Sequence, residues 1–184
     1  LSTTQAAVRE LPKWRAGEEA SAEFARPTVL NCAGPFSKTA PVLMPACIEA
    51  GVNYLDITGE IDVIERAAEL DKQAQAAGIT LSPAVGFDVV PSDCLAAALA
   101  RRCPNATHLR LAFAAGGDAK QSASISRGTA RTVWENAAQG GMVRKGGKLE
   151  KVPAAWKMER FIFPSGARSA VTMPWGDVAS AYYS

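Results

Sequence analysis

Small and polar residues occur in three loops, each of which follows a predicted strand. The first loop is Asn31-Cys32-Ala33-Gly34-Pro35-Phe36, the second Thr58-Gly59-Glu60 and the third Gly86-Phe87-Asp88. Glycine lets the backbone approach a ligand closely, and the free N–H groups at a helix start suit an anion or a ribose. We interpret the loops as ligand-binding loops. For the first loop, the alternative is an ordinary turn that needs glycine.

Side chains in these loops add chemistry. Phe36 could cover a planar ring, and Asp56, Thr58 and Glu60 surround the end of the second strand. Carboxylates at such a position can bind ribose hydroxyls or a substrate ammonium group. Glu60 could equally complement the dipole of the helix that follows it. Asp88, in the third loop, is the better functional candidate among the acids near that helix start.

Composition and charge exclude several classes of protein. Hydrophobic residues make up 48% of the 184 residues and charged residues 21%, which is ordinary for a globular protein. A net charge of +2 does not suggest a nucleic-acid surface. No apolar run approaches the roughly 18 residues of a membrane span. The only histidine, His108, is predicted at the surface or between the domains, and no CxxC pair occurs, which argues against a metal site.

The four cysteines are expected to be reduced. Cys32, Cys47, Cys94 and Cys103 fall mostly within predicted helices or strands that have apolar neighbours. Free cysteine behaves there as a small hydrophobic residue, so we predict buried thiols and a cytoplasmic protein.

Strands and helices alternate regularly from Thr28 onward. Strands are predicted at 28–32, 53–57 and 79–85, with helices up to Gly51, at 61–77 and from Pro91 to before Pro104. Ser37 or Thr39 is placed to cap the first helix, which should begin late or bend because Pro45 would cost about 3 kcal/mol in its interior. Units of this kind predict a parallel α/β sheet, in which the loops leaving the strand ends form one ligand-binding edge.

The pattern changes beyond Asn105. Residues 108–113 alternate as a half-buried strand should, and a helix is predicted at 129–138. A hairpin is predicted around Gly146-Gly147, and further strands at 161–163 and 170–173. We therefore expect two domains: residues 1–104, with a parallel α/β sheet, and residues 105–184, the start of an α+β domain with a mixed sheet.

Several segments, in this order, resemble the saccharopine dehydrogenase-like oxidoreductases, in particular the trans-acting enoyl reductases. The segments span 30–65, 78–102, 126–143 and 171–184, and include CAGPF, YLDITGE and GFDVVPSD. The resemblance implies a Rossmann domain that binds NADP or NAD, a small-molecule substrate and a second domain that shapes the substrate side. A homodimer is compatible with it.

The resemblance also implies roles for individual residues. The residues implied at the nicotinamide side of the cofactor are Asn31, Cys32, Ala33, Gly34, Pro35, Phe36, Thr58 and Gly59. No motif fixes a proton donor, and Asp88, Glu60 and Tyr54 are the candidates.

The glycine-rich phosphate loop of such domains, with its first strand, is not found in this sequence. We therefore expect an internal fragment that holds the second half of a Rossmann-type sheet and, alone, cannot bind the pyrophosphate in the family's manner. Two other interpretations stay open: a dinucleotide-binding scaffold without turnover, and a flavodoxin-like domain that binds another ligand.

Overall fold

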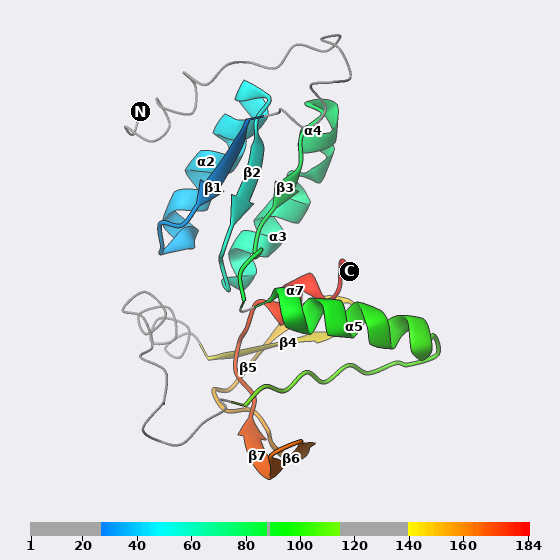
Figure 1. Ribbon diagram of the computed structural model, residues 1–184. Helices are drawn as coiled ribbons and strands as arrows, with labels where there is room; N and C mark the ends of the chain where they lie inside the picture. Colours follow the sequence, from blue (N-terminus) through cyan, green and yellow to red (C-terminus); the bar gives the residue numbers. More distant parts are fainter. Residues whose placement is uncertain (1–26, 88, 115–139) are drawn as a thin grey trace. The chain divides into compact units, whose positions relative to one another are not determined.

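The computed structural model describes residues 27–87, 89–114 and 140–184 (Figure 1). The chain divides into two compact units, Leu1–Val90 and Pro91–Ser184. Helix α5, Val90–Arg102, thus groups almost entirely with the second unit. From the sequence, this helix was predicted to belong to the first domain, residues 1–104. The domain boundary after residue 104 stays a prediction.

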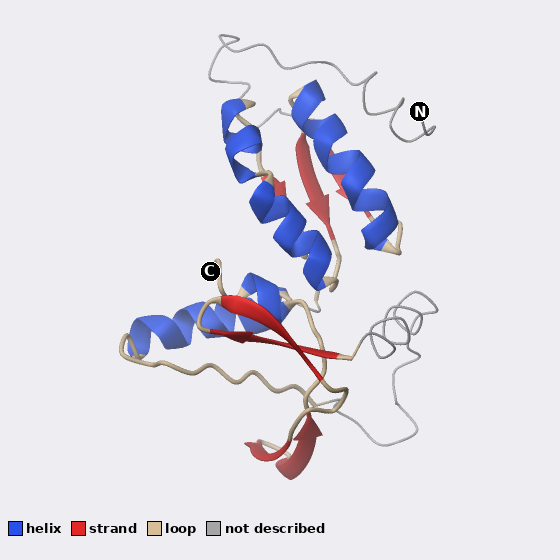
Figure 2. Cartoon of the chain, turned by 180° about the vertical axis from the view of Figure 1, so that it is seen from behind, coloured by secondary structure: helices blue, strands red, loops and turns tan. Residues whose placement is uncertain are grey.

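The first unit is a parallel sheet with helices on one face. Strands β1 (Thr28–Asn31), β2 (Asn53–Asp56) and β3 (Leu81–Ser82) lie in the order β1-β2-β3, all parallel. Helices α2 (Phe36–Ala50), α3 (Ile61–Glu69) and α4 (Asp71–Ala76) cover one face of this sheet (Figures 1 and 2). The predicted α/β class is confirmed, although the third strand is shorter than predicted.

The core of this unit lies between the sheet and its helices. Tyr54, Met44, Val52 and Val63 are among its fully buried side chains. The helix predicted at 61–77 carries an apolar stripe, of which Val63, Ile64, Ala67, Leu70 and Ala74 are buried. Leu70 interrupts this helix and separates α3 from α4. The Leu70 N–H bonds the carbonyls of both Arg66 and Ala67, so the last turn of α3 tightens while Leu70 stays buried.

Of the two alternatives predicted for α2, a late start was wrong, and a bend at Pro45 stays a prediction. The helix starts at Phe36 and contains both Pro41 and Pro45. Both prolines are exposed, so the carbonyls that lose an N–H partner there can turn to water. Pro35 is the N-cap, and neither Ser37 nor Thr39 caps the helix through its side chain. The end at Gly51, in the left-handed conformation with φ 68°, is as predicted.

The second unit contains α5 and two antiparallel hairpins. One joins β4 (Gly141–Lys145) to β5 (Lys148–Val152), and the other joins β6 (Met158–Phe163) to β7 (Gly166–Val171). The first hairpin was predicted with its turn at Gly146-Gly147, whereas only separate strands, at 161–163 and 170–173, were predicted where the second one lies. A short helix, α7 (Asp177–Ser180), follows. Arg144 on β4 donates to the carbonyl of Val178 and stacks on Tyr182, 4.3 Å from the ring centroid, which anchors the first hairpin to α7.

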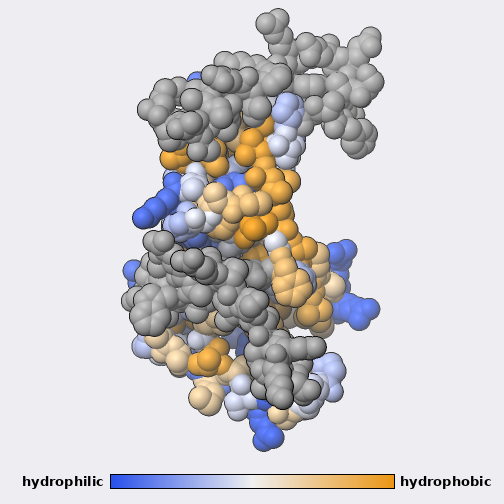
Figure 3. Space-filling view, turned by 60° about the vertical axis from the view of Figure 1, so that its left-hand side comes forward, coloured by the Kyte–Doolittle hydropathy of each residue, from blue (hydrophilic) through white to orange (hydrophobic). Residues whose placement is uncertain are grey.

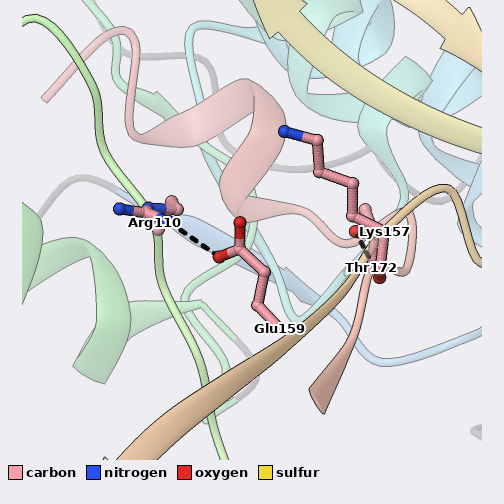
Figure 4. A network of polar contacts seen from close by, with 4 residues as sticks. All are labelled: Arg110, Lys157, Glu159 and Thr172. Atoms are coloured by element: carbon pink, nitrogen blue, oxygen red, sulfur yellow. Dashed lines mark hydrogen bonds and ion pairs between the residues drawn. The ribbon is translucent and has the colours of Figure 1, made fainter. Parts of the chain in front are cut away.

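Polar contacts also tie the second hairpin to the chain around it. Arg110 and Glu159 point toward one another and form an ion pair of 2.8 Å, while Thr172 donates to the carbonyl of Lys157 (Figure 4). The strand predicted at 108–113 was wrong. These residues are extended, but within the described ranges no strand pairs with them, and alternation alone cannot supply a hydrogen-bonding partner.

The cysteine prediction was wrong in one respect. All four thiols are free, but only Cys47 is buried, whereas Cys32, Cys94 and Cys103 are exposed. Burial raises the pKa of Cys47 to about 11. The helix predicted at 129–138 lies outside the described residues. None of the helices in the described ranges has both the length and the apolar character needed to cross a membrane.

Candidate functional site

Hydrogen bonds confirm that the three predicted loops share the carboxyl edge of the sheet. The Glu60 carboxylate accepts from the N–H groups of Phe36, at 2.8 Å, and Ser37, at 2.7 Å, which joins the second loop to the first. The Asp56 carboxylate accepts from the Ala84 N–H at 2.8 Å, which joins the end of β2 to the third loop. We call residues 32–36, 57–60 and 84–87 the rim.

A buried polar network lies beneath the rim. The Tyr54 hydroxyl donates to Asp56 Oδ2 at 2.8 Å and accepts from Asn31 Nδ2 at 3.1 Å. All three side chains are almost fully buried. Each comes from one of two neighbouring strands, because β1 and β2 pair with Asn31 opposite Asp56. Asn31, Tyr54 and Asp56 therefore form one connected group, which we call the buried network.

Both ends of the buried network hold the backbone of the rim. Asn31 Oδ1 accepts from the Ala33 N–H at 3.0 Å, and Thr39 donates to the Ala33 carbonyl at 2.8 Å while accepting from Asn31. At the other end, Asp56 Oδ1 accepts from the N–H groups of both Thr58 and Ala84. Among the described residues, no buried side-chain oxygen or nitrogen lacks a partner. The network thus positions the rim rather than presenting polar atoms to a ligand.

Burial raises the pKa of the two titratable side chains in the buried network, Tyr54 and Asp56. It raises the pKa of Tyr54 far above its ordinary range, although the Asn31 hydrogen bond opposes the shift. Burial also raises the pKa of Asp56, against the lowering effect of the Ala84 and Thr58 N–H groups. Tyr54 therefore stays protonated at neutral pH, and its hydroxyl proton is engaged by Asp56.

The third loop packs closely against the second. A Cβ atom at Gly86 would lie 3.1 Å from the Cβ of Ile57, which is closer than ordinary van der Waals contact. Any residue other than glycine would therefore require Ile57 to move. The Val85 N–H donates to the Asp56 carbonyl at 2.8 Å. Ala84 is buried with a left-handed φ of 61°, a conformation that costs a residue other than glycine about 1–2 kcal/mol. The backbone of this loop is thus fixed by several independent contacts.

The surface of the rim carries several small side chains and is partly apolar. Cys32, Ala33 and Gly34 are exposed, and so are the large side chains of Ile57, Val85 and Phe87. Figure 3 shows orange, hydrophobic side chains gathered on one face of the first unit. Such a surface suits the planar, weakly polar part of a ligand better than a multiply charged group.

The structure brings most of the predicted site residues together. The set is Asn31, Cys32, Ala33, Gly34, Pro35, Phe36, Thr58 and Gly59, with Tyr54 and Glu60 beside it. Their roles toward a cofactor stay predictions. Asp88 lies outside the described residues. His108 is exposed, as predicted, and its Nδ1 contacts the Thr107 hydroxyl.

Sequence reasoning missed two anchors of the rim. Thr39 was considered only as a helix cap, yet it bonds the first loop, and the Ala84 N–H was not considered at all. Asn31 Oδ1 accepts from the N–H of Ala33, two residues later, in a local turn that asparagine favours. The asparagine at this position was therefore a usable signal for the first loop. Within the described ranges, no three His, Cys, Asp or Glu side chains are grouped to hold a metal ion.

Replacing Tyr54 by phenylalanine should lower the free energy of unfolding by about 1–3 kcal/mol, because Asn31 and Asp56 each lose a buried partner. Urea denaturation measures the change. Tyr182→Phe is the matched control, since Tyr182 is 56% exposed and its substitution should change stability by less than about 0.5 kcal/mol. Equal effects of the two substitutions would contradict a network role for Tyr54.

Comparison with known proteins shows partial homology to oxidoreductases. Over 66 residues, 35% of the chain, it is 38% identical to a probable mitochondrial saccharopine dehydrogenase-like oxidoreductase of Arabidopsis thaliana. Over the same length it is 41% and 39% identical to the trans-acting enoyl reductases of Mycobacterium leprae and Mycobacterium tuberculosis. The matches span 14% of the plant protein and 16% of each mycobacterial protein. No family model matches the chain.

Proposed function

We propose that the protein is an NAD(P)-dependent oxidoreductase that transfers a hydride between the nicotinamide and a C=C or C=N bond of a small molecule. The observation that carries the proposal is the homology of 66 residues to saccharopine dehydrogenase-like and enoyl reductase enzymes. The parallel α/β sheet, whose rim lies at the edge where such sheets bind ligands, supports it.

The residues of the rim fit the uncharged end of a dinucleotide. The exposed loop of Cys32, Ala33 and Gly34 has small side chains and a backbone fixed by Asn31 and Thr39, so a planar ring could lie against it. A bound nicotinamide would supply the hydride, and a proton would reach the other atom of the reduced double bond. We assign to this chain's residues the tasks of orienting the ring and excluding water.

Both candidate proton donors that the structure describes are engaged in hydrogen bonds. Tyr54 is buried and engaged, and both oxygens of Glu60 accept backbone N–H groups. These contacts favour, as a second function, a dinucleotide-binding scaffold without turnover. The proposal also includes a homodimer and the cytoplasmic location predicted from the cysteines.

Turnover separates the two functions. The purified full-length protein would be mixed with NADPH or NADH and, in turn, with an α,β-unsaturated thioester and a cyclic imine, and the absorbance of the reduced nicotinamide would be followed. We expect one substrate class to be reduced with a matching loss of absorbance. Cofactor binding without consumption across both classes would overturn the enzyme in favour of the scaffold.

A further inference from the structure

The start of α2 already holds an anion that belongs to the chain itself. The two oxygens of the Glu60 carboxylate accept from separate N–H groups, those of Phe36 and Ser37, at 2.8 and 2.7 Å. The next N–H, that of Lys38, bonds the Pro35 carbonyl. The first-turn N–H groups that a helix ordinarily offers to a ligand are therefore engaged here.

Glu60 is itself held at both ends of its backbone. Its N–H donates to the Thr58 hydroxyl at 3.0 Å, and its carbonyl accepts from the N–H groups of Val63 and Ile64 at the start of α3. One residue thus caps α3 with its main chain and α2 with its side chain. The contact spans 24 residues of sequence and fixes the first rim loop against the second.

We propose that Glu60 is a positioning residue that locks the first two loops of the rim together and, by filling the anion site at the start of α2, keeps phosphate groups out of it. The hydrogen bonds alone support the role of Glu60 in joining the two loops. What this role means for the cofactor rests on the proposed function.

The consequence concerns which end of the cofactor can lie at the rim. A phosphate at the start of α2 would have to displace a carboxylate that makes two charge-assisted hydrogen bonds, and two anions cannot share those N–H groups. The pyrophosphate must therefore be bound elsewhere in the protein. The rim then receives a part of the ligand without formal negative charge.

Removing the carboxylate should turn the start of α2 into an open anion site. In Glu60→Ala, hydrogen exchange at the Phe36 and Ser37 amides should accelerate by about tenfold or more, because their acceptors are gone. Added acetate or inorganic phosphate should slow this exchange again and raise the melting temperature of the variant. Neither anion should do so for the unmodified protein, whose site is filled.

Two further variants keep the test decisive. Asp62→Ala removes an exposed carboxylate from the first turn of α3, and should leave both the amide exchange and the anion response as in the unmodified protein. Glu60→Gln preserves the shape and one acceptor oxygen, so it should fold even if the alanine variant does not, and should free one of the two amides. Unchanged exchange in both Glu60 variants, or an equal anion response in the unmodified protein, would overturn the proposal. Because these measurements need no dinucleotide, a failure of the oxidoreductase proposal would show separately, as absent NADPH binding.

Discussion

Replacing Asp56 by alanine should lower the free energy of unfolding by more than about 3 kcal/mol. The substitution leaves the buried N–H groups of Thr58 and Ala84 and the hydroxyl of Tyr54 without their acceptor, and each such loss costs about 1–3 kcal/mol. Urea denaturation followed by circular dichroism measures the loss. Asp71→Ala, at an exposed carboxylate, is the control and should cost less than about 1 kcal/mol. A similar loss in both variants would contradict the role of Asp56.

Asp56→Asn separates the charge of Asp56 from its hydrogen bonds. Burial raises the pKa of Asp56 in the folded protein, so the folded state binds more protons than the unfolded state between the two pKa values. The contribution of Asp56 to stability is therefore full below the unfolded pKa, about 4, and falls as the pH rises through the folded value. The stability of the unmodified protein relative to Asp56→Asn should decrease over that range. A relative increase with pH would contradict the raised pKa.

In the full-length protein, Ala33→Leu should weaken the binding of NADPH or NADH at least about tenfold, or 1.4 kcal/mol. The Ala33 side chain is exposed on the rim, while its N–H and carbonyl are fixed by Asn31 and Thr39. A larger side chain therefore obstructs the rim without breaking these bonds, and stability should change by less than about 0.5 kcal/mol. Isothermal titration calorimetry gives the affinity.

Ala76→Leu is the matched control for the rim. Ala76 is exposed at the last residue of α4, the helix that leads into β3, and so lies at the opposite edge of the sheet. This variant should bind the cofactor as the unmodified protein does. If Ala33→Leu also kept full affinity, the cofactor would not lie against the first loop.

The sequence was sufficient to predict elements whose burial follows a local period. Strands β1 and β2, the apolar stripe of 61–77 and the helix end at Gly51 were all found in this way. The convergence of the three loops followed from the parallel order of strands. These predictions succeed because each depends on a repeat within a few residues or on the topology of the sheet.

Contacts between distant residues could not be predicted. Glu60 was considered for a ligand contact, for proton donation or for the dipole of its own helix, and nothing local indicated that its side chain caps α2. The alternating residues 108–113 showed a strand pattern but not whether a partner strand was near. The exposure of Cys32, Cys94 and Cys103 likewise depends on which surfaces pack against them, which apolar neighbours in sequence do not reveal.

The thiol of Cys32 provides the most direct test of the central claim, that the rim binds the nicotinamide side of a dinucleotide. Cys32 is exposed on the rim, and Cys103, exposed after α5, serves as an internal control in the same molecule. Alkylation of the full-length protein by iodoacetamide would be followed at each site by mass spectrometry. We predict that saturating NADPH or NADH slows the alkylation of Cys32 several-fold and leaves that of Cys103 unchanged. Equal alkylation of Cys32 with and without bound cofactor would contradict the claim.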